Sequence, residues 1–278
     1  MTRPLFPDLT QPITRTLRRA KIAALLEGVY SLAPLALAYW FKITSFGSPP
    51  AILYAALGIT MSVLLMLRTN TAYDRWWEAR KLWGKLVNVS RNLVIKGRTL
   101  ARPDEAELHR FADLVIGFAP ILRDHLRSGG PALATATDLR PAQHLPSQRT
   151  IEIYETLAGW HHRNLIDGDR LRILDSEARE FLEICGACER ILKTPLSRSY
   201  RMFLRQGIWL YLIVLPWGII GELAWWAVPL TIIQAYLFVA IDEIARAIED
   251  PFGLDDDDLD LDGICRTIEL SVGSAAGR

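Results

Sequence analysis

Four consecutive carboxylates near the end of the chain carry the most suggestive chemistry in the sequence. They occupy Asp255–Asp258, just after Gly253 and Leu254. Adjacent carboxylates repel one another unless water or a cation neutralises them, and hard cations such as Ca²⁺ accept oxygen ligands from carboxylates and backbone carbonyls. The run therefore predicts either a cation site or a solvated acidic segment before a helix, whose dipole favours acids at its start.

A second pattern overlaps this run and resembles a calcium loop. Residues 258–269 fit D-x-D-x-D-G-x₅-E, from Asp258 to Glu269, which is the EF-hand spacing. A Pro-Phe-Gly break at 251–253 precedes the pattern, where an EF-hand loop should leave directly from a helix. The pattern occurs once, and Cys265 occupies a position where a hydrophobic residue such as Ile is usual. We therefore reject an EF-hand here.

The cysteines and histidines form no recognisable site by spacing. Cys185 and Cys188 make a lone C-x-x-C, which we interpret as buried thiols and not as a zinc or redox centre. His161 and His162 are adjacent, which is not ligand spacing, and are expected at the surface. The sequence shows no nucleophile–base set, Gly-rich phosphate loop or His/Cys metal cluster. We therefore expect neither an enzyme nor a required cofactor.

Long apolar segments define the environment of these residues. Half of the 278 residues are hydrophobic, and the net charge of +1 does not favour a nucleic-acid binder. The apolar segments are Ile22–Phe41, Ala51–Leu67 and Gln206–Ile241. A spanning helix needs about 20 apolar residues, so the third segment can form a helical hairpin, turning near Gly221–Ala224. A soluble all-α protein is the alternative, but so long an apolar segment is difficult to bury in one.

Basic residues at the segment ends predict the orientation in a membrane. Lys and Arg are frequent before the first segment and after the second, whereas the linker at 42–50 has one lysine. Basic flanks stay in the cytosol, so we expect four spans in the plasma or inner membrane with both termini cytosolic. The expected organisation is a cytosolic N-terminal segment (1–21), transmembrane helices 1 and 2 (22–67), a helical cytosolic region (68–205), transmembrane helices 3 and 4 (206–241) and a cytosolic C-terminal segment (242–278).

The charged central region has the residue spacing of helices. Residues 68–100 lack proline and should continue the second span as one helix. Helices are also expected over 104–127, 149–164 and 172–192. Residues 131–148 contain three prolines and predict a loop. No alternating strand pattern is present, so the predicted fold class is all-α.

Three motifs resemble one known family. They are R-T-N-T-A-Y-D-R-W-W-E-A-R-K-L-W-G at 68–84, C-E-R-I-L-K-T-P-L at 188–196 and I-E-D-P-F-G at 248–253, the last followed by the acidic run and C-R-T-I-E at 265–269. In this order, over residues 15–270, they resemble the bestrophin family and in particular its bacterial branch. The resemblance implies a homopentameric ion channel whose subunits each give four transmembrane helices and a helical cytosolic region around a central pore. It also implies a helix over Leu261–Glu269.

The resemblance also implies which residues line the pore. The family register places an apolar neck at Ile59, Val63 and Leu67, and a second constriction at the cytosolic exit at Leu196. The i, i+4, i+8 spacing puts the neck residues on one helix face, so five subunits would stack three apolar rings that can gate by dewetting. From the residues alone, packing residues of a membrane helix would be the favoured interpretation, and only the family register favours the neck. Equally suitable by type are Leu57, Leu64 and Leu65.

In the animal branch of the family, a calcium clasp occupies the position of the acidic run. By position, its side-chain ligands would be Asp255 and Asp258, with backbone carbonyls near Ala247 and Asp250 and one from a neighbouring subunit. Calcium is thus a possible ligand by resemblance, with inorganic ions, membrane lipid and further copies of the chain as partners.

The expected activity is passive ion conduction, of anions such as chloride by family, with cations also conducted in the bacterial branch. A secondary transporter is the first alternative, and it would need a polar site within the spans. The acids in the apolar segments are Glu27 and Glu222. We expect Glu222 at a turn and Glu27 near the cytosolic end, close to Arg19 or water. The second alternative is a calcium-responsive membrane scaffold that does not conduct.

Overall fold

The computed structural model describes residues 15–41, 51–129, 144–255 and 257–278, and every regular element in these residues is a helix. The all-α prediction is therefore confirmed for this part of the chain. The chain divides into two compact units, the first formed by Met1–Asp74 and Leu196–Glu249, the second by Arg75–Pro195 and Asp250–Arg278. The central region was expected to run from 68 to 205, whereas the corresponding part of the second unit is Arg75–Pro195.

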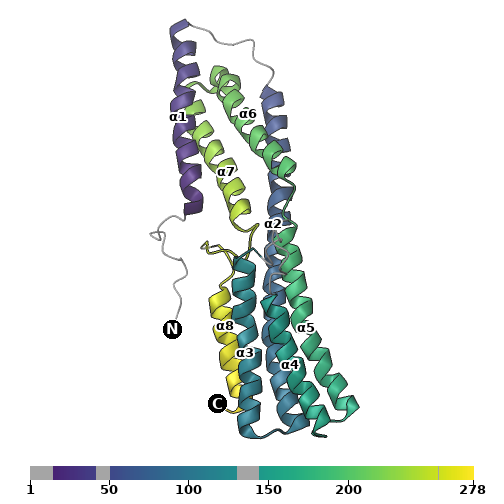
Figure 1. Ribbon diagram of the computed structural model, residues 1–278. Helices are drawn as coiled ribbons and strands as arrows, with labels where there is room; N and C mark the ends of the chain where they lie inside the picture. The colour runs from purple at the N-terminus through teal and green to yellow at the C-terminus, as the bar shows by residue number, and fades with distance from the viewer. Residues whose placement is uncertain (1–14, 42–50, 130–143, 256) are drawn as a thin grey trace, which may run out of the picture. The chain divides into compact units, whose positions relative to one another are not determined.

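The first unit is built from long apolar helices (Figure 1). They are α1 (Arg15–Phe41), the first part of α2 (Ala51–Lys96), α6 (Arg198–Leu223), the short η2 (Ala224–Trp226) and α7 (Ala227–Ala247). α6 and α7 form a hairpin, and α1 packs along both of its arms. At the turn, Ala224 has φ +49° and donates its N–H to the carbonyl of Ile220. The predicted hairpin, with its turn near Gly221–Ala224, is confirmed.

Among the described residues, three stretches are long and apolar enough to cross a membrane. They are Leu17–Phe41, Ile52–Ala101 and Arg198–Ala247. The last contains both arms of the α6–α7 hairpin, so it has the length of two crossings. The total of four spans stays a prediction.

Glycines on α6 make room for large side chains of α2 within the first unit. A Cβ at Gly218 would overlap the ring of Tyr54, and a Cβ at Gly207 would lie 2.9 Å from the sulfur of Met61. Small residues at helix contacts are the usual basis of tight packing in membranes, where lipid leaves no hydrophobic force to drive helices together. These contacts fix which face of α2 is turned toward α6.

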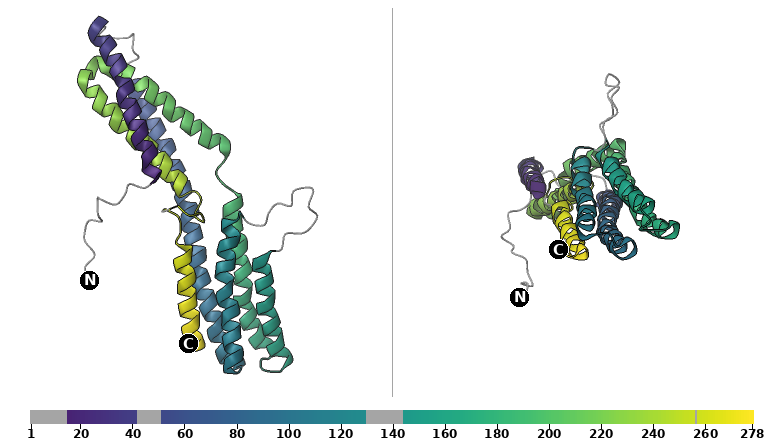
Figure 2. Two further views of the ribbon diagram at one scale, coloured as in Figure 1. Left: turned by 60° about the vertical axis from the view of Figure 1, so that its left-hand side comes forward. Right: turned by 60° about the horizontal axis from the view of Figure 1, so that its bottom comes forward.

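The second unit is a helical bundle around an aromatic core. Its helices are the rest of α2, η1 (Gly97–Ala101), α3 (Glu105–Arg127), α4 (Leu145–His162), α5 (Gly168–Lys193) and α8 (Leu261–Ala276). α3 packs against α4, and α8 lies along α3 (Figures 1 and 2). Phe111 packs against Trp160, and Phe118 meets Phe181 edge to face at 4.8 Å. The predicted helices over 68–100, 104–127, 149–164 and 172–192 are confirmed, with shifts of a few residues at their ends.

Side-chain caps set the starts of these helices. Asp104, Asp167 and Asp260 each accept a hydrogen bond from a backbone N–H three residues later, at 2.7–2.8 Å, as N-cap residues do. α4 starts earlier than predicted, because His144 caps it and Pro146 sits in its first turn, where the missing N–H is harmless. The expected loop over 131–148 is therefore wrong for its last residues, while 130–143 lie outside the described residues.

Candidate ion-conduction surface

One face of α2 in the first unit is apolar and exposed. Ile59, Val63 and Leu67 have 66%, 45% and 49% of their surface exposed, and they follow one another along that face. The hydroxyls of Thr60 and Ser62 donate at 2.8 Å to carbonyl oxygens one turn earlier in the same helix. Those hydroxyls are thus satisfied by the helix itself, and the predicted row presents hydrocarbon.

The opposite face of α2 is buried inside the first unit. Tyr54, Met61, Leu65 and Ala72 are each at most 9% exposed. Leu65 therefore packs inside the unit and cannot line a pore surface of α2. Among the other leucines, Leu64 is half-buried and Leu57 is exposed. Exposure separates the predicted row from Leu65 but not from Leu57, which lies on another side of α2, so the neck stays a prediction.

A buried arginine sets the rotation of α2 next to this row. Arg68 is 1% exposed and hydrogen-bonds Asp242, while its second Nη atom lies 3.9 Å from Glu249. Arg201 reaches Glu249 at 2.8 Å. A buried charge is tolerated where opposite charges and hydrogen bonds compensate it. Because Arg68 points inward, its neighbour Leu67 is turned to the exposed side.

Positive charge gathers around this ion pair. A pocket of about 310 Å³ in the first unit is lined by Met202 and by five arginines, which are Arg68, Arg198, Arg201, Arg205 and Arg246. Asp242 and Glu249 neutralise part of this charge. The remainder attracts anions, because clefts lined by one sign of charge concentrate counter-ions.

Contrary to the expectation from the sequence, Glu27 meets neither Arg19 nor water. Its side chain is buried in α1, and Oε1 has no hydrogen-bond partner in the part of the chain that the structure describes. Arg19, which was expected to meet it, instead pairs with Glu243 at 3.2 Å. Glu27 faces the interior because it stands with Ala20, Ala23 and other buried positions on the packed face of α1.

In the second unit, the Arg-Trp-Trp motif connects α2 to neighbouring segments through hydrogen bonds. Arg75 donates to the carbonyl of Ile191 at 2.7 Å and also to that of Thr194, at the end of α5. Trp76 donates its indole N–H to the carbonyl of Asp257 at 3.2 Å. The motif therefore joins the end of α5 and the acidic segment to α2 through hydrogen bonds to backbone carbonyls.

The acidic segment folds back on itself beside a buried phenylalanine. Phe252 is 1% exposed, and Leu259 donates to the carbonyl of Pro251 at 3.1 Å. The carboxylate of Asp258 accepts the N–H of Asp255 at 2.7 Å. A side chain at Gly253 would meet that carboxylate at 2.6 Å, so a larger residue there would displace the Asp258 carboxylate from the turn.

The donor chemistry of this turn suits a hard cation. Burial, together with the nearby carboxylates of Asp255, Asp250 and Asp257, raises the pKa of Asp258 to about 6. A divalent cation would relieve that repulsion, and carboxylate oxygens are the ligands Ca²⁺ prefers. Asp255, Asp258 and Asp250 belong to the second unit and Ala247 to the first. The calcium clasp stays a prediction.

The structure bears out the rejection of an EF-hand. α8 starts at Leu261, with Asp260 as its N-cap, and so occupies most of the residues that an EF-hand loop would need. The helix predicted over Leu261–Glu269 is thereby confirmed.

Leu196 lies in the short connection between α5 and α6. It is half-buried and follows Pro195, outside both helices. Proline prevents α5 from continuing. The role of Leu196 as a cytosolic constriction stays a prediction.

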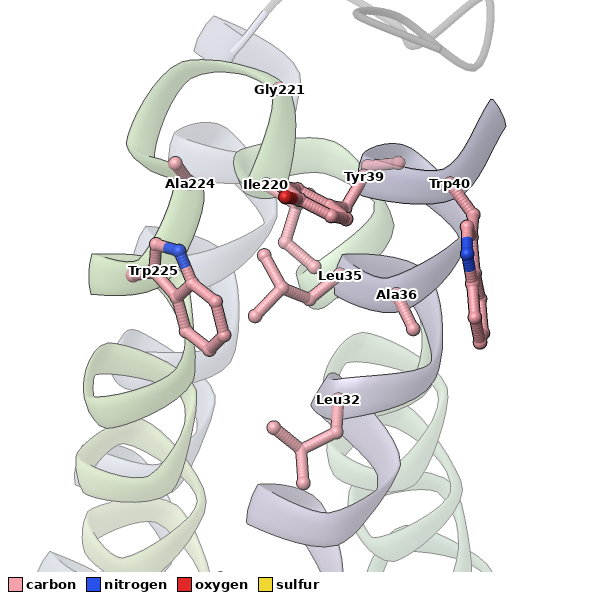
Figure 3. A pocket seen from close by; sticks show the side chains of 10 residues that line it. Leu32, Leu35, Ala36, Tyr39, Trp40, Ile220, Gly221, Ala224 and Trp225 are labelled. Carbon is pink, nitrogen blue, oxygen red and sulfur yellow. The ribbon is translucent and has the colours of Figure 1, made fainter. Parts of the chain in front are cut away.

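A large apolar pocket lies between the end of α1 and the α6–η2 turn, with a volume of about 740 Å³. Figure 3 shows Leu32 and Leu35 of α1 on one side of it and Trp225 on the other. The residues that line it carry no formal charge. Such a lining suits hydrocarbon and offers no charged group to an ion.

One polar cluster in the second unit was missed by the sequence reasoning. It consists of His125 near the end of α3, His144 at the start of α4, and Cys185 and Glu189 on α5, whose ligand atoms lie within 4.8 Å of one another. Cys185 and Cys188 are buried thiols, as predicted. The only local signal was the i, i+4 spacing of Cys185 and Glu189, since both histidines are distant in sequence.

Burial and hydrogen bonding shift the pKa values of Glu189 and Cys185 in opposite directions. Burial opposes ionisation of Glu189, yet hydrogen bonds from His144, His125 and Lys193 lower its pKa to about 2. Burial raises the pKa of the Cys185 thiol to about 12. The cluster thus holds a carboxylate and a neutral thiol at ordinary pH.

Comparison with known proteins identifies the family. A sequence model of bacterial and fungal bestrophin proteins matches residues 13–274. The chain belongs to the bestrophin family. Among its relatives, a voltage-dependent anion channel-forming protein of Mesorhizobium japonicum is 36% identical over 260 residues, covering 90% of this chain and 82% of the relative. The voltage-dependent anion channel-forming protein YneE of Escherichia coli K12 is 32% identical over 258 residues, covering 89% and 84%.

Solved bestrophin structures share the fold. A bacterial bestrophin homologue from Klebsiella pneumoniae superposes with a TM-score of 0.82 at 23% identity, covering 92% of this chain and 98% of the other. The resemblance drawn from the motifs is confirmed. This bestrophin is a membrane protein of a channel-forming family and not an enzyme.

Proposed function

We propose that this bestrophin is the pore-forming subunit of a homopentameric ion channel in the plasma or inner membrane, with both termini in the cytosol. The observation that carries the proposal is the apolar row Ile59, Val63 and Leu67, which is exposed while the other face of α2 is packed. An exposed hydrocarbon row can face lipid or other copies of α2. The channel-forming names of the relatives favour the second arrangement, around a central axis.

The row would act as a gate by excluding water. Five copies of α2 would bring three rings of hydrocarbon together, and an ion passing them loses hydration without gaining ligands. The hydroxyls of Thr60 and Ser62 do not offset this cost, because they are bonded within the helix. Leu196 would form a second, shorter constriction at the cytosolic exit.

The permeant ions proposed are anions such as chloride. The relatives are named as anion channels, and the arginine-lined pocket of the first unit supplies an attractive field for anions. The neck itself carries no charge, so selectivity would come from that field and not from the gate. Membrane lipid would cover the remaining apolar surface.

Calcium is the proposed regulator. Asp255 and Asp258 would provide carboxylate oxygens, with backbone carbonyls near Ala247 and Asp250. Burial, together with repulsion from the neighbouring carboxylates, raises the pKa of Asp258. This supports a cation there, because a bound divalent ion would neutralise the buried charge.

The test is conduction by the purified protein. Its oligomer mass is measured in detergent, and the same sample is placed in planar bilayers under a potassium chloride gradient. A pentamer with step-like currents that reverse near the chloride equilibrium potential is the expected result. A pentamer without conductance contradicts the channel, whereas reversal near the potassium potential contradicts only anion selectivity. Adding Ca²⁺ to the cytosolic side tests the regulator in the same experiment.

The second candidate function is secondary transport, favoured by Glu27. An acid buried within an apolar segment is a candidate for a coupling site, and Glu27 has no hydrogen-bond partner among the described residues for Oε1. Transport would give chloride flux that depends on a proton gradient and is lost in Glu27→Gln. A channel would keep its currents in that variant.

A further inference from the structure

Four side chains from three helices of the second unit converge on one point. The Nε2 atoms of His125 and His144 lie 2.7 and 2.8 Å from the same carboxylate oxygen of Glu189. The sulfur of Cys185 lies 3.9 Å from that oxygen. His125 is 9% exposed and Cys185 is 1% exposed, so most of the cluster is shielded from water.

We propose that His125, His144, Cys185 and Glu189 form a structural zinc site. Two imidazole nitrogens, a thiolate and a carboxylate oxygen are the ligand types that tetrahedral Zn²⁺ takes, at about 2.0–2.3 Å. Ligand atoms around such an ion stand roughly 3.3–3.8 Å apart, and those of the cluster lie within 4.8 Å of one another. Small side-chain rotations, without a change of helix position, would therefore admit the ion.

The charge balance of the cluster favours a divalent ion. Glu189 is a carboxylate, and Cys185 would lose its proton to water when the metal binds, so the two ligand charges match those of Zn²⁺. Lys193 holds the other carboxylate oxygen of Glu189 at 3.3 Å. The oxygen facing the histidines is thus left for the metal. Nitrogen and sulfur ligands distinguish this site from the all-oxygen chemistry of calcium.

Ser147 is suited to orient one ligand. Nδ1 of His144 accepts the N–H of Ser147 at 3.1 Å and lies 2.6 Å from its hydroxyl oxygen. Metal binding at Nε2 requires the imidazole proton on Nδ1, and the Ser147 hydroxyl can accept it. Such outer hydrogen bonds orient ligating histidines. Ser147 would be a positioning residue. The backbone N–H of Ser147, which would lose Nδ1 of His144 as its acceptor, would hydrogen-bond to water instead.

The site would cross-link the bundle. His125 stands near the end of α3, His144 at the start of α4, and the other two ligands on α5. A metal would fix these three helices to one another and would link the two histidines through a common ion. This role is independent of ion conduction and holds whether or not the chain forms a pore.

The experiment is a metal titration of the full chain, purified in detergent without a histidine tag and treated with a chelator. Co²⁺ replaces Zn²⁺ as a visible probe. The expected result is about one ion per chain, tetrahedral cobalt absorption and a sulfur-to-cobalt charge-transfer band, all displaced by Zn²⁺. Zn²⁺ should also raise the melting temperature, and Ca²⁺ at the same concentration should not.

Variants make the assignment specific. Cys185→Ser should abolish the charge-transfer band, whereas Cys188→Ser, a buried thiol one turn away, should retain it. His125→Asn should weaken binding, and the exposed His162→Asn should not. Ser147→Ala should weaken binding by about tenfold without lowering the melting temperature of the metal-free protein, and Ser147→Thr should restore it. Absence of the band in the wild-type chain, or equal zinc stabilisation of Cys185→Ser, would overturn the proposal.

Discussion

In the second unit, the guanidinium of Arg75 on α2 donates to the carbonyl of Ile191 at 2.7 Å and bonds the carbonyl of Thr194 as well. The last carbonyls of a helix have no partner within it, and a cation near a helix C-terminus also interacts favourably with its dipole. Arg75 therefore caps α5 from a neighbouring helix. The family motif marks this cap and not a pore position.

Removing this cap should loosen the second unit. Arg75→Ala leaves two carbonyls at the end of α5 without their charged donor. Hydrogen bonds to charged groups contribute about 1.5–3 kcal/mol each. The free energy of unfolding should therefore fall by no less than the contribution of one such bond. Chemical denaturation followed by tryptophan fluorescence measures the loss, and hydrogen exchange should locate it at the end of α5.

A neighbouring contact provides the control for Arg75. Arg190 pairs with Glu78 at 2.8 Å between the same two helices, but its side chain is 65% exposed. Exposed ion pairs contribute about 1 kcal/mol or less. Arg190→Ala should therefore be nearly neutral. Equal losses in the free energy of unfolding of the two variants would show that Arg75 contributes no more than an exposed ion pair does.

The buried pair of Arg68 and Asp242 gives a second prediction, for the first unit. Their side chains are 1% and 6% exposed. Breaking such a pair leaves an uncompensated buried charge and costs about 3–5 kcal/mol. Arg68→Met alone should therefore lower the melting temperature strongly. Adding Asp242→Leu should recover much of the loss, because the carboxylate that hydrogen-bonded Arg68 is then removed while Glu249 keeps its ion pair with Arg201. A double variant less stable than Arg68→Met would argue against a paired role.

Much of this fold was predictable, because its signals are local. Hydrophobic length located α1, α2 and the α6–α7 hairpin, and the turn near Gly221–Ala224 followed from composition. Residue spacing predicted α3 and α5, whereas α8 was expected from the family resemblance. The start of α4 was misjudged because Pro146 resembles a loop residue, and only its position behind the His144 cap shows that it lies in a first helical turn.

The sites were less predictable, because they depend on contacts between distant residues. His125, His144 and Glu189 come together only when α3, α4 and α5 pack, and a lone C-x-x-C gave no hint of them. Glu27 looked peripheral by its place in the segment, yet its rotation on α1 buries it. The exposure of Ile59 and the burial of Leu65 likewise follow from the contacts of α2 and not from residue type.

The contact between Gly218 and Tyr54 gives a third prediction. A methyl group at 218 would overlap the tyrosine ring, so Gly218→Ala must separate α2 from α6 or displace Tyr54. Overpacking costs about 1–3 kcal/mol, which thermal unfolding in detergent measures. Tyr54→Ala in the same chain should suppress the defect of Gly218→Ala. Without such suppression, the close approach would not be the cause.

The matched control is a glycine with free space around it. A Cβ at Gly186 on α5 would meet nothing within 4 Å. Alanine is favoured over glycine inside a helix by about 1 kcal/mol, so Gly186→Ala should leave stability unchanged or raise it slightly. A loss there would mean that helix glycines in this chain are needed for reasons other than packing.

The proposed neck gives the last prediction. Replacing Ile59, Val63 and Leu67 together by alanine widens and shortens the hydrocarbon barrier that excludes water. A barrier lower by about 1.4 kcal/mol raises the rate about tenfold, so the macroscopic current should increase on the order of tenfold. Single-channel recordings in planar bilayers distinguish a higher conductance from a longer open time.

Two leucines of the same helix test the register of that row. Leu57 is 50% exposed but points to another side of α2, and Leu65 is 1% exposed and packs inside the first unit. Leu57→Ala should leave the current unchanged. Leu65→Ala creates a cavity and should lower stability by about 2–5 kcal/mol without raising the current per channel. If Leu57→Ala opens the channel as much as the triple variant does, the ring lies on a different face of α2, because side chains two residues apart cannot share one line of a helix.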